Sequence, residues 1–395
     1  MRAKWLPKLL TGLVILGMLA ACAAPAAPSP TAPPPAAPTA PPPAAPTAPP
    51  PAAPTAAPAE PTSAPPAGMS GPLHILNWQG YGSDEAWALQ AFQDKYGVEI
   101  VHDYYNSNEE LLTKLRTSPG TYDAVLIGNT WGWQAIEEGL LAPVETAQLS
   151  NFADLSTKLV DLPEMRRGDI LYGIPWDWGA TGIAYNTEQI TDPVDSWDIM
   201  WDPKYKGMVA WQDYFLDNVM FAAIALGQDP NKPSDLEAVK AKLIELMPQL
   251  RTFWASEDEF NKLFASSETV IGTYWSGSSA RAAKMGLSLK FVVPKEGAIG
   301  WVDSWAIPKD APHYDTALAW IDYMVSPEFY LEWDAKIGAP VPSNEKTAAG
   351  LPDDSLNKSY LSQPDVIARL VFYAPLSEAD KQVWVELWEE VKASQ

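Results

Sequence analysis

The residues from 73 to 129 alternate between short apolar runs and helical patterns, which limits the possible folds more than any other feature. The runs "LHILNW" (73–78), "VEIVHDYY" (98–105) and "YDAVLIGN" (122–129) are typical of strands. The first helical segment between them is expected to begin at an N-cap, Ser83, and to end at Gly97. A β-α-β-α-β order predicts an open α/β sheet with helices on both faces. Ligands bind such sheets beyond the carboxyl ends of the strands, where "NWQGY", "YYNSNE" and "GNTWGW" fall.

The rest of the chain continues in the same style. About 325 residues follow Pro72, more than one hydrophobic core usually supports, so two lobes are expected. "GATGIAYNT" (179–187) is predicted to be a strand that crosses between the lobes. Amphipathic helices are predicted over 314–330 and 381–393, and the acidic run near Glu257 is expected to be a solvated turn.

The first 71 residues have the composition of an export signal and a stalk. Arg2, Lys4 and Lys8 precede an apolar run that is too short to span a bilayer, which predicts a signal peptide over residues 1–21. "LAAC" resembles a bacterial lipobox, which implies lipidation of Cys22; the alternative is an ordinary signal peptide with a stray cysteine. Residues 22–71 then repeat "APPPAAPT", which favours an extended polyproline stalk of roughly 150 Å.

Charge and cysteine content exclude several classes of function. The formal net charge of −22 repels nucleic acid and anionic lipid and attracts cations to clefts. With Cys22 as the single cysteine, neither a disulfide nor a thiolate metal site can form. The chain has no G-x-S-x-G or H-E-x-x-H motif, so we expect no enzyme, no metal and no cofactor.

The chain contains, in order, the motifs "NWQGY", "YNSNE", "YDAVL", "YGIPWDWGATGIAYN", "SWDIMWDPKYKG", "MPQLRTFWAS", "WSGSSA" and "VVPKEGAIGWVDSWAIPK". Together these motifs resemble those of the extracytoplasmic spermidine/putrescine-binding proteins of ABC transporters. The resemblance implies a two-lobed α/β periplasmic-binding-protein fold of type II, with a ligand cleft between the lobes and crossover strands as the hinge. It implies an N-terminal lobe from 72–182 and 303–342, and a C-terminal lobe from 183–302 and 343–395. Its implied partners are a polyamine, a membrane permease and, through the lipid, the outer face of the membrane; the protein is expected to be a monomer.

The same resemblance implies the residues that contact the ligand. Aromatic side chains would pack on the methylenes of the amine and carboxylates would bind its nitrogens, with Asp303 at one ammonium and Asp213 and Asp217 at another. Two departures, Thr130 and Ala339, fall where the family often has an aromatic residue and leave the particular amine open. The implied ligand residues are Trp78, Gln79, Tyr81, Thr130, Trp131, Asp213, Asp217, Trp275, Trp301 and Asp303.

Asp303 also stands out on physical grounds. It lies between Trp301 and Trp305 in an apolar stretch, and a carboxylate in such a place needs a partner or a proton. We expect the partner to be an ammonium group of the ligand and Trp305 to belong to the core. Alternatively, Asp303 caps a turn or pairs with Lys309.

Other interpretations remain open at this point. Asp213 and Asp217 are equally compatible with a solvated helix face. A sugar-binding lipoprotein would also combine indole rings with aspartates. A secreted glycoside hydrolase would need two carboxylates about 5–10 Å apart across the scissile bond.

Overall fold

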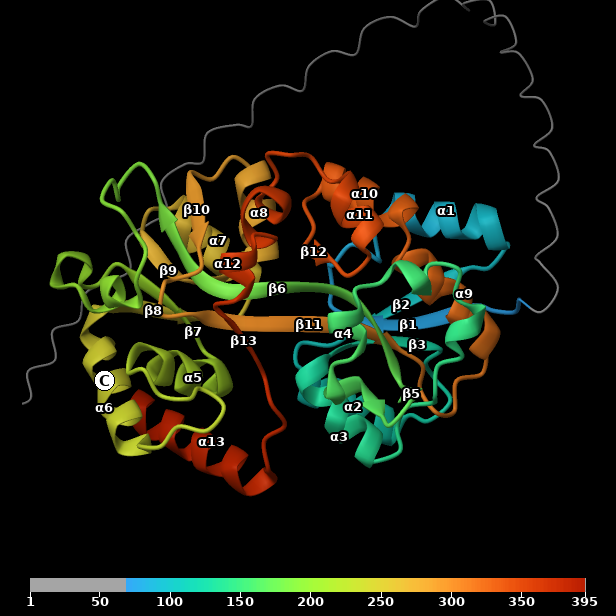
Figure 1. The fold of residues 1–395 in the computed structure, drawn as a ribbon, viewed down its shortest axis with the longest axis horizontal. Helices are drawn as coiled ribbons and strands as arrows, with labels where there is room; N and C mark the ends of the chain where they lie inside the picture. The colour runs from blue at the N-terminus through green and yellow to red at the C-terminus, as the bar shows by residue number, and fades with distance from the viewer. Residues whose placement is uncertain (1–68, 395) are drawn as a thin grey trace, which may run out of the picture. The chain divides into compact units, whose positions relative to one another are not determined.

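The computed structural model describes residues 69–394, so the predicted signal peptide, Cys22 and nearly all of the predicted stalk lie outside the described residues. The described chain is built on an eleven-stranded mixed sheet with helices packed on it (Figure 1). The main path of the sheet runs β2 (Ile100–Tyr104), β1 (Leu73–Asn77), β3 (Ala124–Gly128), β11 (Ala298–Ala306), β6 (Gly173–Asn186), β9 (Ile271–Trp275), β7 (Val209–Gln212) and β8 (Leu250–Trp254). Three further strands pair with the two central strands: β10 (Leu289–Val292) and β12 (Val341–Pro342) with β6, and β13 (Leu370–Phe372) with β11. A separate hairpin contains β4 (Arg166–Arg167) and β5 (Ile170–Leu171).

The three strands predicted near the start are confirmed as the parallel strands β1, β2 and β3. The predicted end of the first helix is also confirmed: α1 (Ala86–Tyr96) stops at Gly97, whose φ of 69° suits glycine. Its predicted start is wrong, because the N-cap is Glu85. The Ser83 hydroxyl is occupied instead by Asn77, whose amide donates to it over 2.7 Å.

One half of the molecule contains β1–β3 and the helices around them (Figure 1). The predicted helix over 314–330 is two helices, because Pro327 has no N–H for a continuous helix and Ser326 caps the second one. The helices of this half are α1, α2 (Asn108–Thr117), α3 (Asn129–Glu137), α4 (Thr157–Val160), α9 (Tyr314–Met324), α10 (Pro327–Lys336) and α11 (Glu345–Gly350), the last of which packs against α10.

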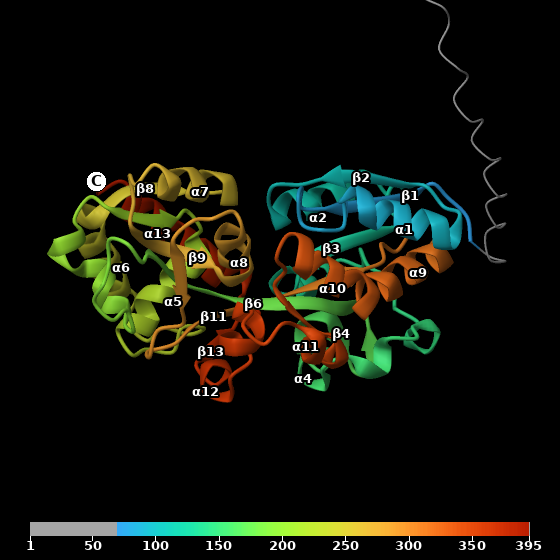
Figure 2. The same ribbon diagram turned by 90° about the horizontal axis from the view of Figure 1, so that it is seen from above.

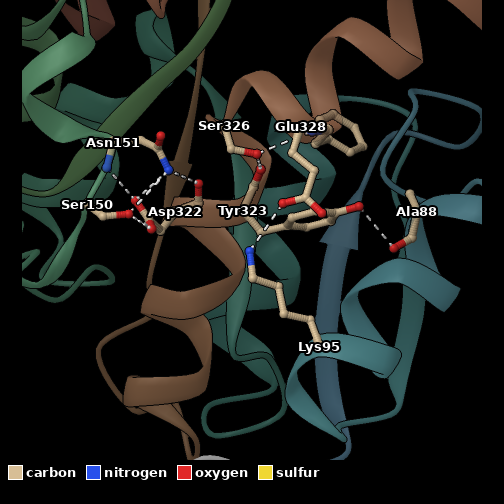
Figure 3. A network of polar contacts seen from close by, with 9 residues as sticks. Ala88, Lys95, Ser150, Asn151, Asp322, Tyr323, Ser326 and Glu328 are labelled. Carbon is tan, nitrogen blue, oxygen red and sulfur yellow. Dashed lines mark hydrogen bonds and ion pairs between the residues drawn. The ribbon is translucent and has the colours of Figure 1, made fainter.

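A polar network fastens these helices together at the C-terminal end of α9 (Figure 3). Asp322 accepts hydrogen bonds from the Ser150 hydroxyl at 2.6 Å and from the Asn151 backbone at 2.9 Å. The hydroxyl of Tyr323 donates to the Ala88 carbonyl of α1 over 3.5 Å. These hydrogen bonds hold the end of α9 against α1 and against residues 150–151.

The other half contains β7–β10 and a second set of helices. The predicted C-terminal helix is confirmed as α13, which packs against α5 and α6. The expected turn near Glu257 is wrong, because a capping box of Ser256 and Glu259 begins helix α7 there. The helices are α5 (Phe215–Ala225), α6 (Leu236–Leu246), α7 (Glu257–Ala265), α8 (Ser276–Lys284), α12 (Pro364–Ile367) and α13 (Glu378–Lys392).

Two long strands, β6 and β11, join the halves into a two-lobed α/β fold (Figure 2). The predicted crossover strand is confirmed, although β6 begins earlier than expected, at Gly173, and is buried along all of its 14 residues. Its first part pairs with β11 and β12, and its last part with β9 and β10. The antiparallel register with β11 pairs Asp303 with Asp177 and contains a bulge between Asp303 and Ser304. None of the helices within 69–394 is both long and apolar enough to cross a bilayer.

Candidate ligand site

The candidate site lies where the strands of the first lobe end and β11 passes them. Trp78 and Tyr81 follow β1, Thr130 lies at the start of α3 after β3, and Asp303 pairs with Gly128 at the end of β3. The carboxyl ends of parallel strands meet at one edge, which explains why segments far apart in sequence converge here.

Asp303 is partly buried and accepts a hydrogen bond from the Tyr81 hydroxyl over 3.2 Å. Burial raises the pKa of Asp303 to about 6, and the hydrogen bond from Tyr81 opposes that shift. Within residues 69–394 no lysine or arginine forms an ion pair with Asp303, and Lys309, the alternative partner, is exposed. The carboxylate therefore has one neutral donor and no cation from the described chain.

Aromatic rings hold Tyr81 in position. Trp176 and Trp333 stack on each other with their ring centres 4.8 Å apart, and both meet the Tyr81 ring edge-on at 5.6 Å. The guanidinium of Arg281, from α8 of the second lobe, lies 5.7 Å from the Tyr81 ring. These contacts fix the hydroxyl that points at Asp303.

A second aspartate, Asp177, lies beside Asp303. It is fully buried, and the register of β6 and β11 makes the two residues direct cross-strand neighbours. Neither carboxylate oxygen of Asp177 has a hydrogen-bond partner in the described region. Burial and then the charge of Asp303 raise the pKa of Asp177 well above its usual value, whereas Arg281 and Tyr81 lower it.

Indole rings flank these carboxylates along β6. Trp301 pairs with Gly179, and a Cβ atom on that glycine would lie 2.3 Å from the Trp301 ring, so only glycine leaves room for the indole. Trp275 pairs with Thr181 on the opposite side of β6 and meets Trp254 edge-on at 4.9 Å.

A third aspartate, Asp217, belongs to the second lobe. It is 2% exposed at the start of α5 and accepts a short hydrogen bond from the Tyr373 hydroxyl. Burial raises the pKa of Asp217 to about 7, against the effect of the hydrogen bond. Tyr373 is near enough to Asp303 for that charge to contribute to its own raised pKa. A cavity of about 10 Å³, roughly enough for one water molecule, lies beside Tyr373. Its lining residues are Asn129, Thr130, Leu162, Glu164, Gly300, Val302, Phe372 and Tyr373.

Residues 87–359 match the bacterial extracellular solute-binding protein family. The chain belongs to that family. The solute-binding protein is 29% identical over 326 residues to the spermidine/putrescine-binding periplasmic protein of Salmonella typhimurium, covering 81% of this chain and 91% of that one. It is 30% identical over 276 residues to the putrescine-binding periplasmic protein PotF of Escherichia coli, covering 65% of this chain and 74% of that one.

Solved structures show the same fold. The spermidine/putrescine ABC transporter substrate-binding protein PotD of Streptococcus pneumoniae superposes with a TM-score of 0.72 at 24% identity. That alignment covers 82% of the solute-binding protein and 98% of PotD. The periplasmic-binding-protein fold predicted from the sequence is therefore confirmed.

Three of the predicted ligand residues have other surroundings in the solute-binding protein. Asp213 is exposed and accepts hydrogen bonds from Trp388 at 2.8 Å and Lys392 at 3.4 Å, both on α13. Trp131 is buried, and Lys381 of α13 lies 4.0 Å from its ring. Gln79 is exposed.

Trp78 lies at the edge of the site, whereas Ala339 and Trp305 lie in the core. Trp78 packs on Tyr105 with ring centres 4.3 Å apart. Ala339 and Trp305 are fully buried, as was expected for Trp305.

Sequence reasoning missed Asp177, Tyr373 and Glu164. Glu164, 6% exposed, lines the cavity, and its Oε2 has no hydrogen-bond partner among residues 69–394. A signal for Asp177 was present, because "PWDWG" places an aspartate between two tryptophans as "WVDSW" does. No comparable pattern surrounds Tyr373 or Glu164. Over the same residues, no group of three or more histidine, cysteine or acidic side chains is arranged to hold a metal ion.

Proposed function

We propose that this solute-binding protein captures a polyamine between its lobes and delivers it to an ABC permease. One observation carries the proposal: Asp303, a carboxylate among aromatic rings, has a tyrosine hydroxyl but no cation of the described chain as its partner. Since a charge in such surroundings needs a counter-ion, a cationic solute fits it. The names of the relatives, which include putrescine- and spermidine-binding proteins, support the same ligand class.

A polyamine joins ammonium groups through apolar methylenes, and the residues proposed here match both parts. Asp303 and Asp217 would bind ammonium groups toward the two lobes, and the indoles of Trp301, Trp275 and Trp78 would pack on the chain between them. Each aromatic contact with a cation contributes roughly 0.5–2 kcal/mol. A sugar would gain from the rings, but it would leave the charge of Asp303 without a counter-ion.

Lobe closure would couple binding to delivery. The contacts that join the halves in the described chain include Arg281 over Tyr81 and Lys381 over Trp131. A ligand that touches both walls adds to these contacts and favours the closed form. We propose that the permease recognises this closed form and that the protein acts as a monomer.

The anchoring of the protein is also part of the proposal. Cys22, after "LAA", would carry the lipid, and residues 23–71 would hold the binding domain away from the membrane. Radiolabelled palmitate incorporated by the wild type and not by Cys22→Ala would support the anchor. Equal labelling of both proteins would refute it.

The ligand is tested by isothermal titration of the purified chain with putrescine, spermidine and maltotriose. We expect both amines to bind and the sugar not to bind. Asp303→Asn should weaken amine binding by about 2–5 kcal/mol, or roughly 30-fold to several thousand-fold. The melting temperature of the ligand-free protein should not fall, because the carboxylate has no cation to lose.

The matched control is Asp192→Asn, which removes the same charge from an exposed aspartate paired with Lys204. It should bind amines like the wild type. Binding of maltotriose without binding of either amine would refute the proposed function. A large loss of stability in ligand-free Asp303→Asn would make Asp303 a structural residue.

A further inference from the structure

Asp177 is a carboxylate that is buried without a polar partner in the described chain. It is 0% exposed and neither of its carboxylate oxygens has a hydrogen-bond partner among residues 69–394. Leaving a carboxylate ionised in such a position costs several kcal/mol. A buried carboxylate avoids this cost if it binds a cation or carries a proton.

The backbone directs Asp177 toward Asp303. The two residues are paired across the antiparallel strands β6 and β11, which puts their side chains on the same face of the sheet. The register shift next to Asp303 leaves Trp176 as an extra residue in β6, and such bulges re-aim the side chains beside them. The Trp176 indole is anchored by a 2.9 Å hydrogen bond to the Met324 carbonyl. The geometry of the aspartate pair is therefore built into the sheet.

The groups that face the pair do not neutralise it. Four phenols interact with the charges of the pair, one from each of four segments: Tyr81 after β1, Tyr105 after β2, Tyr330 on α10 and Tyr373 after β13. Burial is the main cause that raises the pKa of every one of these phenols, so they stay uncharged. The Tyr81 hydroxyl has a single proton, which it donates to Asp303.

Arg281, whose charge lowers the pKa of Asp177, forms its ion pair with another carboxylate, although its Nη1 has no hydrogen-bond partner in the described chain. Arg281 of α8 donates through Nε to Glu257 at 2.9 Å and through Nη2 to the same carboxylate. Its ion pair in the described region is with Glu257 and with neither aspartate. The aspartate pair is therefore left without an ion-paired cation of the described chain.

We propose that Asp177 and Asp303 together form a two-carboxylate seat for one primary ammonium group of the ligand, and that the bound ammonium replaces a proton which the two carboxylates share in the ligand-free protein. This inference rests on the proposed amine-binding function and assigns Asp177 to it. A primary ammonium has three N–H donors, enough to serve both carboxylates and one further acceptor such as the Tyr81 oxygen. The displaced proton passes to the solvent buffer, so the exchange is balanced in charge.

The sign of the pH dependence follows from the exchange. The pKa of Asp177 is raised by burial and by the charge of Asp303, so the ligand-free pair keeps a proton near neutral pH. A bound ammonium favours the ionised form of both carboxylates and expels that proton. Amine affinity should then rise by up to about tenfold per pH unit wherever one proton is released per ligand.

The test is calorimetric titration of the purified chain with putrescine between pH 5.5 and 8. Each titration is repeated in phosphate and in Tris, whose different ionisation enthalpies reveal the number of protons released. The wild type should release at least one proton near pH 6–7. Asp177→Asn should release about one proton fewer than the wild type, its affinity should rise less steeply with pH, and at pH 8 it should bind putrescine at least about tenfold more weakly than the wild type. Asp192→Asn, with the same change in charge at an exposed site, should behave as the wild type.

The outcomes separate this inference from the proposed function. Putrescine binding by the wild type without proton release, or proton release in Asp177→Asn that equals that of the wild type, overturns the two-carboxylate seat and leaves polyamine binding intact. Failure of both putrescine and spermidine to bind the wild type overturns the proposed function itself. If Asp177→Asn does not fold, the proton count of Asp217→Asn decides, because the release of about one proton that remains in that variant comes from the aspartate pair, and its absence overturns the seat.

Discussion

Replacing Asp217 with asparagine should change how the stability of the ligand-free protein depends on pH. Asp217 is 2% exposed, and burial raises its pKa from 3.8 to about 7. The folded protein therefore holds a proton on Asp217 between about pH 4 and pH 7, where the unfolded chain has already released it. Since the folded-state pKa is raised, this group's favourable contribution is complete below pH 4 and is lost as the pH rises through 7.

The magnitude follows from the shift. Three pKa units correspond to about 4 kcal/mol, which is the most that the wild type can lose through this group between pH 4 and pH 8. Asparagine cannot ionise, and its carbonyl can still accept the hydrogen bond from Tyr373. Its amide adds two buried donors at a cost of about 1–3 kcal/mol, but that cost does not depend on pH.

The measurement is urea unfolding of both proteins, stripped of bound amine by unfolding and refolding, at several values from pH 4 to pH 8. The free energy of unfolding of Asp217→Asn, minus that of the wild type, should increase by up to about 4 kcal/mol across this range. Asp192→Asn, altered at an exposed residue, should show no such increase. Parallel stability curves for Asp217→Asn and the wild type would refute the argument from burial.

Two further variants test the packing around the site. Gly179→Ala places a methyl group 2.3 Å from the Trp301 ring and 2.6 Å from the Ser276 hydroxyl, so it should cost about 1–3 kcal/mol of stability and weaken putrescine binding about tenfold. Urea unfolding and tryptophan fluorescence titration measure the two effects, and unchanged affinity would mean that the indole does not contact the ligand. Lys381→Gln removes the cation 4.0 Å from the Trp131 ring and should weaken putrescine binding two- to fivefold in the same titration, whereas a change of less than twofold would show that this contact does not stabilise closure.

Local patterns in the sequence predicted the elements whose causes are local. The strands β1 to β3 follow from β-branched and aromatic runs, and Gly97 ends α1 because its φ of 69° suits glycine. At two positions, contacts with other residues overrode the local sequence pattern. Ser83 binds Asn77 and does not cap α1 as expected. Glu257 lies in helix α7, where it forms an ion pair with Arg281.

The composition of the site depends on contacts between distant parts of the chain. Asp177 meets Asp303 only because β6 and β11 pair in one register with a bulge, and no local pattern specifies that register. Asp213 is bound by Lys392, 179 residues further along the chain. The resemblance to a family supplied candidates for the ligand residues, but it could not show which carboxylates the protein neutralises by itself.

The arrangement of the sheet has a consequence for how the chain acquires its structure. β3 ends at Gly128, yet its antiparallel neighbour β11 begins only at Ala298, and α9 and α10 of the same half come later still. A growing chain that stops short of β11 lacks the central strand against which β3 packs. Such distant pairings slow folding, because a long loop must close before the contacts form. During synthesis from the N-terminus, neither half can therefore be completed until most of the chain has been made.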